Sequence, residues 1–439
     1  MMAVSTQKLG RLDWLFVGTL LVVFGGIILH APLSVWLSSL FPAAELLIKS
    51  WKEILLLFAT VLAGVILFRK KQWGTLKNPL ILLVLAYAVL HVLLLPLSWQ
   101  GIQSTLAGLV IDLRYLLFFV LIYVAITLYP TLRKQFIITF FVGAFIVAAF
   151  ALLQVFVLPP DILKYIGYGK ETISPYLTVD ENPEFVRINS TFRGPNPLGA
   201  YAGIVLALLF AYWLRVKQSS VRRPVAAISV ILLGSFVALW ASYSRSALVA
   251  AFVAIAIIFA VTIAKKFSRK LWTIFIVTAL VVGGTVLVFR DSSFVSNVVL
   301  HENETTGAAT NSNDGHVESL QDGVSRMIRQ PLGGGVGSTG SASLLGNEPL
   351  IIENQYLFIA HESGWIGLAL FAAISWRLLK SLWQQRKDWL ALGVFASGIG
   401  MVLIGLLLPV WVDDTVSIIW WGLAAIALVS SRPQKSKAN

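Results

Sequence analysis

The sequence predicts an all-α, polytopic membrane protein. Two observations carry this prediction. The 439 residues are 57% hydrophobic and only 13% charged, with a mean hydropathy of +0.82, and long apolar runs recur along the chain. So little polar surface cannot cover a water-soluble globule. Because the runs are continuous and show no alternation of period two, helices rather than a β-barrel must satisfy the backbone hydrogen bonds.

About twelve transmembrane helices are expected, since a helix needs about 20 apolar residues to cross the hydrocarbon layer. The second candidate is weakened near one end by Lys49, Lys52 and Glu53. We interpret the first as a helix rather than a signal peptide, because it lacks a small-residue cleavage site and leads into further spans. The candidate spans are 12–30, 46–68, 79–96, 106–128, 136–158, 197–214, 225–243, 246–264, 271–289, 355–376, 389–410 and 415–431.

The basic residues predict the orientation of these helices. The net charge is +13, and most of the 34 Lys and Arg residues fall in alternate connections, where Asp13 and Asp388 are the acidic neighbours. This asymmetry predicts a multi-pass protein of the cytoplasmic (inner) membrane with both termini in the cytoplasm. The basic excess is thereby explained by topology, and no nucleic-acid partner is expected. The basic segments are 8–11, 69–77, 133–134, 215–223, 265–270, 377–387 and 432–437.

We divide the chain into four regions: N-terminal transmembrane helices (1–185), transmembrane helices with outward-facing arginines (186–289), a large extracytoplasmic loop between the ninth and tenth helices (290–354), and C-terminal transmembrane helices (355–439). Within the loop, apolar residues recur at helical spacing from His316 to Arg329, before Pro331. A short amphipathic helix is expected there. The glycines of 333–337 allow a tight turn or a close approach of the backbone to a ligand.

Four arginines on the predicted outer face are candidate phosphate ligands, because the guanidinium fork suits phosphate oxygens. The strongest candidate is Arg245, since its link, 242–246, is too short to reach far into water. The alternative is that each arginine snorkels to lipid headgroups or pairs with a neighbouring acid. The four are Arg187, Arg193, Arg245 and Arg326.

Two histidines are candidate general bases, because the ordinary pKa of histidine lies near neutrality. They are His316, in the loop, and His361, which is followed by Glu362 at the start of the tenth span and should be buried enough to need partners. The chain has no cysteine, and no histidine pair has the spacing of a zinc helix motif. Neither a disulfide nor a metal site is therefore expected.

Four stretches over roughly residues 185–375 resemble the O-antigen ligase and O-antigen polymerase family of bacterial envelope glycosyltransferases. Residues 191–199 look like the family's Pro-Asn-x-x-Gly entry to a span, and 244–247 look like its Ser-Arg link. Residues 315–316 with 331–337 resemble its loop segment. Its signature is a His-Asn pair, nine residues, then Gly-x-x-Gly; here Glu353 and Asn354 precede Gly364 and Gly367 at that spacing. The family's histidine is thus Glu353, a carboxylate that can still accept a proton.

The resemblance implies a GT-C-like enzyme that transfers a glycan from a polyprenyl diphosphate carrier to a hydroxyl of an acceptor lipid or glycan on the outer face. No metal, cofactor or nucleotide sugar is implied, and membrane lipids surround the spans. Either a ligase or a polymerase fits. A transporter or flippase of lipid-linked glycans and an inactive scaffold are the alternatives. The expected diphosphate ligands are Arg193, Arg245, Arg187, Arg326 and Asn354, and the rival bases are Glu353, His361 and His316.

Overall fold

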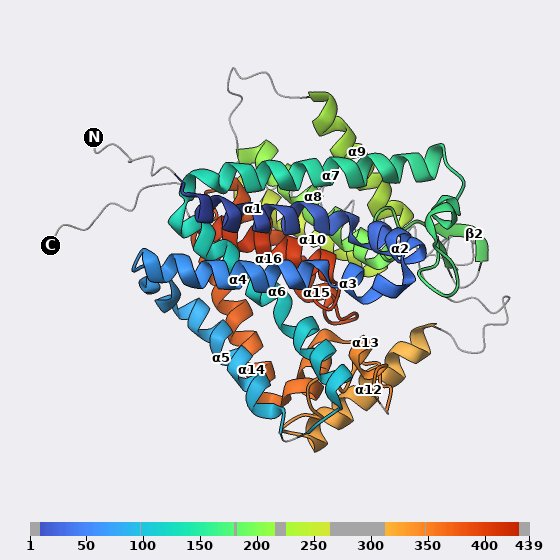
Figure 1. The fold of residues 1–439 in the computed structure, drawn as a ribbon. Helices are drawn as coiled ribbons and strands as arrows, with labels where there is room; N and C mark the ends of the chain where they lie inside the picture. Colours follow the sequence, from blue (N-terminus) through green and yellow to red (C-terminus); the bar gives the residue numbers. More distant parts are fainter. Residues whose placement is uncertain are drawn as a thin grey trace.

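A computed structural model describes residues 9–96, 98–179, 182–215, 225–263, 312–346 and 348–429, without the side chains of 312–318 (Figure 1). The predicted span 271–289 lies outside these residues, as does the loop from 290 to 311. The remaining predictions of helices can be compared with the structure directly.

The described part of the chain is almost entirely helical. One two-stranded antiparallel hairpin, which the all-α prediction did not include, interrupts the connection before α8 and pairs Leu177 with Arg187. The elements are α1 (Arg11–Gly26), η1 (Ile27–Leu29), α2 (His30–Leu40), η2 (Pro42–Ala44), α3 (Glu45–Lys49), α4 (Trp51–Arg69), η3 (Trp73–Lys77), α5 (Pro79–Leu94), α6 (Ile102–Leu128), η4 (Pro130–Leu132), α7 (Arg133–Phe156), η5 (Ile162–Ile166), β1 (Leu177–Val179), β2 (Asn182–Arg187), α8 (Pro195–Arg215), α9 (Val225–Ala241), α10 (Arg245–Ile263), α12 (Ser312–Arg329), α13 (Gly340–Ser343), α14 (Gln355–Gln384), α15 (Trp389–Ile404) and α16 (Asp414–Leu428).

Seven described helices are long and apolar enough to cross a membrane, and four shorter helices are also apolar. Each coincides with one of the predicted spans, so the all-α, polytopic prediction is confirmed, while the total of twelve stays a prediction. The seven are Arg11–Leu40, Trp51–Arg69, Ile102–Leu128, Pro130–Phe156, Pro195–Arg215, Arg245–Ile263 and Gln355–Gln384, and the four are Pro79–Leu94, Val225–Ala241, Trp389–Ile404 and Asp414–Leu428.

Helix α16 forms the centre of the bundle (Figure 1). Every residue from Asp414 to Ala427 is buried. Around it, small residues allow helix backbones to approach closely: Gly203 of α8 faces Ala251 of α10, and Gly400 of α15 faces Ala250. Such contacts stabilise helix pairs in lipid, where burial of apolar surface supplies little driving force. The outer helices instead expose long apolar faces, as the surface of a membrane bundle must.

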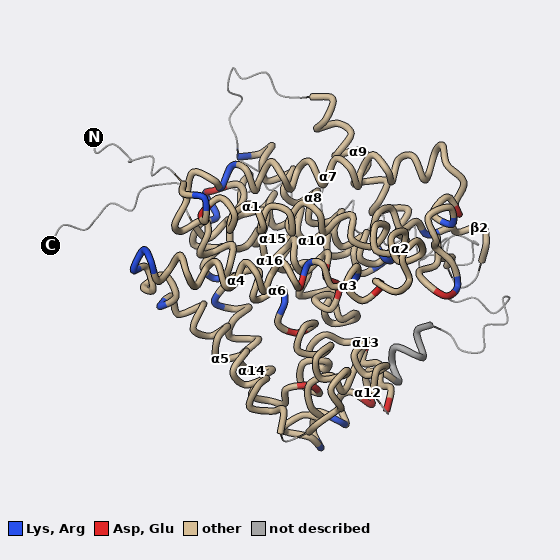
Figure 2. Tube along the Cα trace, viewed as in Figure 1, with Lys and Arg blue, Asp and Glu red and all other residues tan. Residues whose placement is uncertain are grey.

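The two ends of the bundle differ in charge and shape. Lys and Arg gather where α1 begins and α4 ends (Figure 2). There Lys70 lies 2.9 Å from Asp13, and Arg133 lies 2.9 Å from Asp388 and donates to the carbonyl of Ile426. We call this the basic end; α1 begins and α16 ends here. The opposite end, which carries the β1–β2 hairpin, α12 and α13, is the loop end.

The amphipathic loop helix is confirmed as α12, which begins at Ser312, before the predicted start. Its Gly323 lies against Leu357 and Ile352, where an added Cβ would meet the Leu357 side chain at 2.9 Å. One face of α12 therefore packs on the start of α14. Leu320 and Ile328 remain exposed on the helix.

The glycines after α12 form tight turns against the protein's own backbone. Gly333, Gly335 and Gly337 have φ of +87°, +103° and +84°, in the region that favours glycine. A Cβ on Gly337 would collide with the backbone carbonyl of Ser104 in α6. The sequence analysis allowed a close approach of this backbone to a ligand. In the structure the glycine backbone instead lies against α6 and α14.

Candidate functional site

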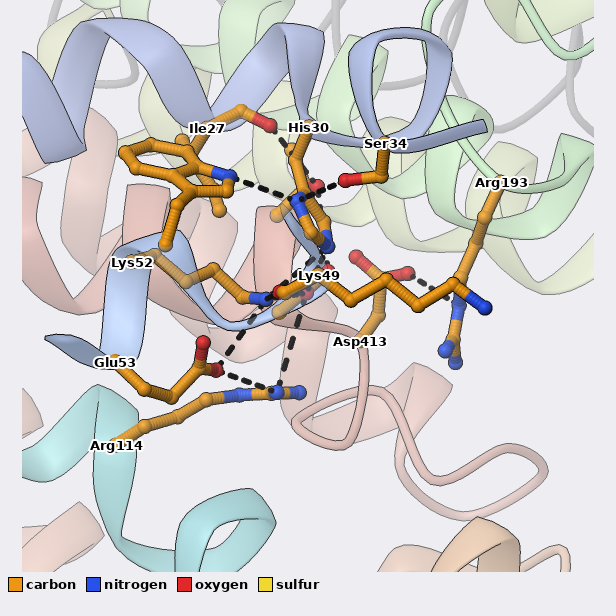
Figure 3. A network of polar contacts seen from close by, with 12 residues as sticks. Ile27, His30, Ser34, Lys49, Lys52, Glu53, Arg114, Arg193 and Asp413 are labelled. Atoms are coloured by element: carbon orange, nitrogen blue, oxygen red, sulfur yellow. Dashed lines mark hydrogen bonds and ion pairs between the residues drawn. The ribbon is translucent and has the colours of Figure 1, made fainter. Parts of the chain in front are cut away.

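A buried cluster of charged side chains lies at the loop end, around the start of α16 (Figure 3). Asp414 Oδ2 lies 3.0 Å from Lys52 Nζ, 3.2 Å from His30 Nε2 and 3.9 Å from Arg114 Nη1. Glu53 Oε1 lies 3.3 Å from Lys52 Nζ and 3.5 Å from Arg114 Nη1. The cluster therefore joins α2, α4, α6 and α16, and its charges are paired as buried charges must be.

The imidazole of His30 is fixed by its neighbours. Trp51 Nε1 donates to His30 Nδ1 at 3.0 Å, and Ser34 Oγ lies 3.0 Å from the same nitrogen. Because an indole N–H can only donate, Nδ1 is the acceptor, and Nε2 faces both Asp414 Oδ2 at 3.2 Å and Lys52 Nζ at 3.0 Å. The histidine thus extends the hydrogen bonding of Asp414 into the start of α2.

Asp413 connects this cluster to a half-exposed arginine. Its Oδ1 accepts the N–H of Val416 at 2.9 Å and caps α16, while its Oδ2 lies 3.0 Å from Arg193 Nε. The side chain of Arg193 is 48% exposed, whereas that of Asp413 is 7% exposed. Arg114 Nη2 donates to the carbonyl of Val412 at 2.7 Å. A fixed carboxylate at a helix N-cap therefore orients an arginine toward the outside of the bundle.

Arg187 lies beside the short link that precedes Arg245. Its Nε donates to the carbonyl of Ser242 at 2.9 Å, and its Nη2 donates to Asn196 Oδ1 at 2.6 Å. Arg245 begins α10 directly after this link. Arg187 and the backbone that carries Arg245 are therefore brought together at the loop end.

Gly199 explains why the two family-like motifs meet. A Cβ at this position would lie 2.7 Å from Ser242 Oγ and 2.9 Å from Ala247 Cβ. The entry to α8 and the Ser-Arg link thus pack through a glycine. In the link, Tyr243 has φ of +48°, an unusual conformation for a residue with a side chain. Partial burial raises the pKa of its hydroxyl above the ordinary value, so the group stays protonated near neutral pH.

Glu353 and Asn354 lie at the start of α14. Asn354 Oδ1 accepts the N–H groups of Tyr356 and Leu357, and its Nδ2 donates to the carbonyl of Leu406 at 2.7 Å. Asn354 is therefore an N-cap that also holds the connection 405–413. Glu353 is partly buried, and its backbone N–H donates to Ser319 Oγ at 3.3 Å.

The connection 405–413 bridges the two parts of the predicted site. At one end Leu406 accepts from Asn354, and Gln355 Oε1 accepts the N–H of Trp411 at 2.8 Å. At the other end Asp413 pairs with Arg193. The structure thus links Arg193 to Asn354, the residue after Glu353, through a single short connection.

The other predicted residues, His361, Arg326 and His316, lie on α14 and α12, not on the segments that carry Arg187, Arg193 and Arg245. His361 is 4% exposed, under the glycine turn, where a Cβ on Gly334 would lie 2.7 Å from the imidazole Cε1. Arg326 pairs with Asp322 on its own helix at 2.6 Å. The backbone of His316 belongs to α12, but its side chain lies outside the described residues.

Glu362 has a structural role that sequence reasoning left open. It is 1% exposed and accepts the N–H groups of Gly337 at 2.8 Å and Thr339 at 3.2 Å. The main-chain carbonyl of His361 also accepts the N–H of Gly334, so both neighbours support the glycine turn, although the buried imidazole Nδ1 of His361 has no hydrogen-bond partner among the described residues.

Sequence reasoning missed the cluster around Asp414. A signal was present, because Lys52 and Glu53 in an otherwise apolar span should be paired or functional. Asp413 and Asp414, adjacent at the start of a span, gave a second signal. Within the described residues no three His, Cys, Asp or Glu side chains could hold a metal ion; metal independence stays a prediction.

One segment of the chain matches a known protein family. Residues 230–372 match the family model described as O-antigen ligase. The matched segment runs from within α9 into α14 and so includes the Ser-Arg link and the Glu353-to-Gly367 signature. No curated protein matches the chain. The resemblance inferred from the motifs is thereby confirmed.

We expect the cluster to be needed for stability. Lys52→Met should lower the free energy of unfolding by about 3–5 kcal/mol, because it leaves the two buried carboxylates of Asp414 and Glu53 with one cationic side chain, Arg114, to share. Lys49→Met is the matched control, since Lys49 pairs with Glu45 on the exposed surface and should contribute about 0–1 kcal/mol. The thermal unfolding midpoint of the detergent-solubilised proteins measures the difference; equal midpoints would contradict the assigned role.

Proposed function

We propose that this chain, which carries an O-antigen ligase segment at residues 230–372, is a membrane glycosyltransferase. It moves a glycan from a polyprenyl diphosphate carrier to an acceptor hydroxyl on the outer face of the cytoplasmic membrane. The single observation that carries the proposal is the position of Arg193, half exposed beside Asp413 and joined by one short connection to Asn354, which directly follows Glu353 in the sequence. The basic end would then face the cytoplasm, as the positive-inside rule requires.

The diphosphate would bind at the guanidinium groups of the loop end. In the cluster, the formal charges of Lys52 and Arg114 are balanced by Glu53 and Asp414. Arg193 shares the carboxylate of Asp413, but 48% of its side chain faces outward. With Arg187 at the end of β2 and Arg245 at the start of α10, it would receive the phosphate oxygens. Charge on the leaving diphosphate grows as the glycosidic bond breaks, so these groups stabilise the transition state more than the ground state.

Glu353 is the proposed base. The acceptor oxygen attacks the anomeric carbon, the bond from that carbon to the diphosphate oxygen breaks, and the acceptor proton passes to the Glu353 carboxylate. The diphosphate leaves with the electron pair of the broken bond. Glu353 is favoured over His361 because it is only partly buried, whereas His361 lies under the glycine turn. His316 remains a rival until its side chain is tested.

The same chemistry serves a ligase, which attaches finished chains to a different acceptor, and a polymerase, which extends a chain on its own carrier. A transporter of lipid-linked glycans is less well supported. Transport needs a polar path between the two ends of the bundle. The central helix α16 is instead apolar from Ile418 to Leu428.

The arginine role is tested by substitution. Arg193→Ala should lower the rate of glycan transfer in membranes by about 10²-fold or more, the loss typical of removing one group that stabilises developing charge. Arg193→Lys should retain part of the rate, because the charge remains without the fork. Arg386→Ala, at the basic end, is the control and should transfer at the parent rate. Parental activity in Arg193→Ala would remove Arg193 from the site.

The base is tested by restoring the family's residue. Glu353→Gln should lower the rate about 10²- to 10⁴-fold, because the amide cannot accept the proton. Glu353→His should recover activity with a pH dependence shifted toward that of imidazole. The pH profile of the transfer rate is the measurement, with His361→Gln for comparison. Full activity in Glu353→Gln together with inactivity in His361→Gln would assign the base to His361.

A further inference from the structure

A pocket of about 560 Å³ lies at the loop end, outside the groups assigned above. It opens between the segment that leads into α6 and the segment that follows α13. This volume is within the range of about 300–1,000 Å³ that is usual for small-molecule sites. Its lining includes the side chains of Trp99, Gln100, Gln103, Leu345 and Glu348.

The lining combines one aromatic face with uncharged and acidic hydrogen-bonding groups. Trp99 is 58% exposed, although it is the largest apolar side chain of the pocket. Two amides and a carboxylate surround it, and the described lining residues include no Lys or Arg. A pyranose ring fits this set, because its C–H face packs on the electron-rich indole and its hydroxyls both donate and accept hydrogen bonds.

The backbone around the pocket is held in place from several sides. Gln100 Nε2 donates to the carbonyl of Gly334 at 2.7 Å, which leaves the amide oxygen as an acceptor. Gly101, with φ of +86°, turns the chain into α6. Ser104 Oγ lies 2.8 Å from the carbonyl of Gly337 and 2.9 Å from that of Ala342, and so ties α6 to α13. A preformed site of this kind orders few groups when a ligand binds.

The pocket is connected to His361 through the glycine turn, and to the proposed base, Glu353, through the chain. Gln100 contacts Gly334, whose N–H donates to the carbonyl of His361. Glu348 precedes Glu353 by five positions in the sequence. A saccharide in the pocket would therefore contact the segment of chain that leads to Glu353.

We propose that this pocket is a saccharide subsite for a neutral or N-acetylated pyranose of the transferred or accepting glycan. The biological role of this subsite rests on the proposed function. The binding of a saccharide to the pocket does not. A uronic acid is disfavoured, because Glu348 would repel its carboxylate and no cation among the described lining residues would offset the repulsion. Such a pyranose could belong either to the donor glycan or to the acceptor glycan.

Binding is tested with the full-length protein in nanodiscs and three probes: maltotetraose, chitotetraose and tetragalacturonate. At least one neutral probe should bind the parent, and Trp99→Ala should weaken it by about tenfold or more. Trp99→Phe, which keeps an aromatic face, should recover part of the affinity. Trp73→Ala is the matched control, because Trp73 is 48% exposed at the basic end, and it should bind as the parent does.

Equal affinity of parent and Trp99→Ala, failure of the parent to bind either neutral probe at millimolar concentration, or preference for tetragalacturonate would overturn the proposal. The result is separable from the transfer reaction, because Arg193→Ala should keep saccharide binding. If transfer is found to need neither Arg193 nor Glu353 while Trp99-dependent binding persists, only the proposed function fails. In transfer assays, a KM raised for one substrate alone in Trp99→Ala identifies the donor or the acceptor glycan as the occupant.

Discussion

The paired charges at the start of α16 are the constraint on which the loop end depends. A single buried ion at this depth would be strongly unfavourable, so Asp414 requires Lys52, His30 and Arg114 together. Those partners come from three other helices, and Asp413 adds the segment before α8 through Arg193. Five parts of the chain are thus held in one arrangement by neighbouring carboxylates. A site for a highly charged headgroup needs such rigidity, because its ligands must be in place before the charge develops.

The signature glycines act on the architecture rather than on a ligand. Gly364 has φ of +68° and ψ of −171°, which breaks the regular course of α14, and its position lies against the backbone of Pro331 and Leu332. The N–H of Trp365 then donates to the carbonyl of Pro331 at 2.9 Å. The kink therefore allows the segment 331–337 to pack against α14. The spacing between Asn354 and Gly364 sets the distance from the N-cap of α14 to this contact.

The sequence was sufficient for the spans that the structure describes, for α12 and for the burial of His361 and Glu362, because each is a local consequence of hydropathy or helical spacing. It was insufficient for the cluster around Asp414, since His30 and Asp414 lie nearly 400 positions apart and only the packing of α2 against α16 brings them together. The β1–β2 hairpin was also missed, because its strands are short and half exposed. The sequence also did not predict that the amide of Asn354 caps α14 and holds Leu406; its role as a diphosphate ligand stays a prediction.

Direct binding of prenyl diphosphates tests the central claim, that arginines held by the Asp413–Asp414 cluster receive a diphosphate headgroup. Geranylgeranyl diphosphate, geranylgeranyl monophosphate and geranylgeraniol can be titrated into the purified full-length protein in nanodiscs. The diphosphate should bind most tightly, the alcohol most weakly, and Arg193→Gln should remove most of that preference. Equal affinity for all three ligands, or an unchanged preference in Arg193→Gln, would contradict the account.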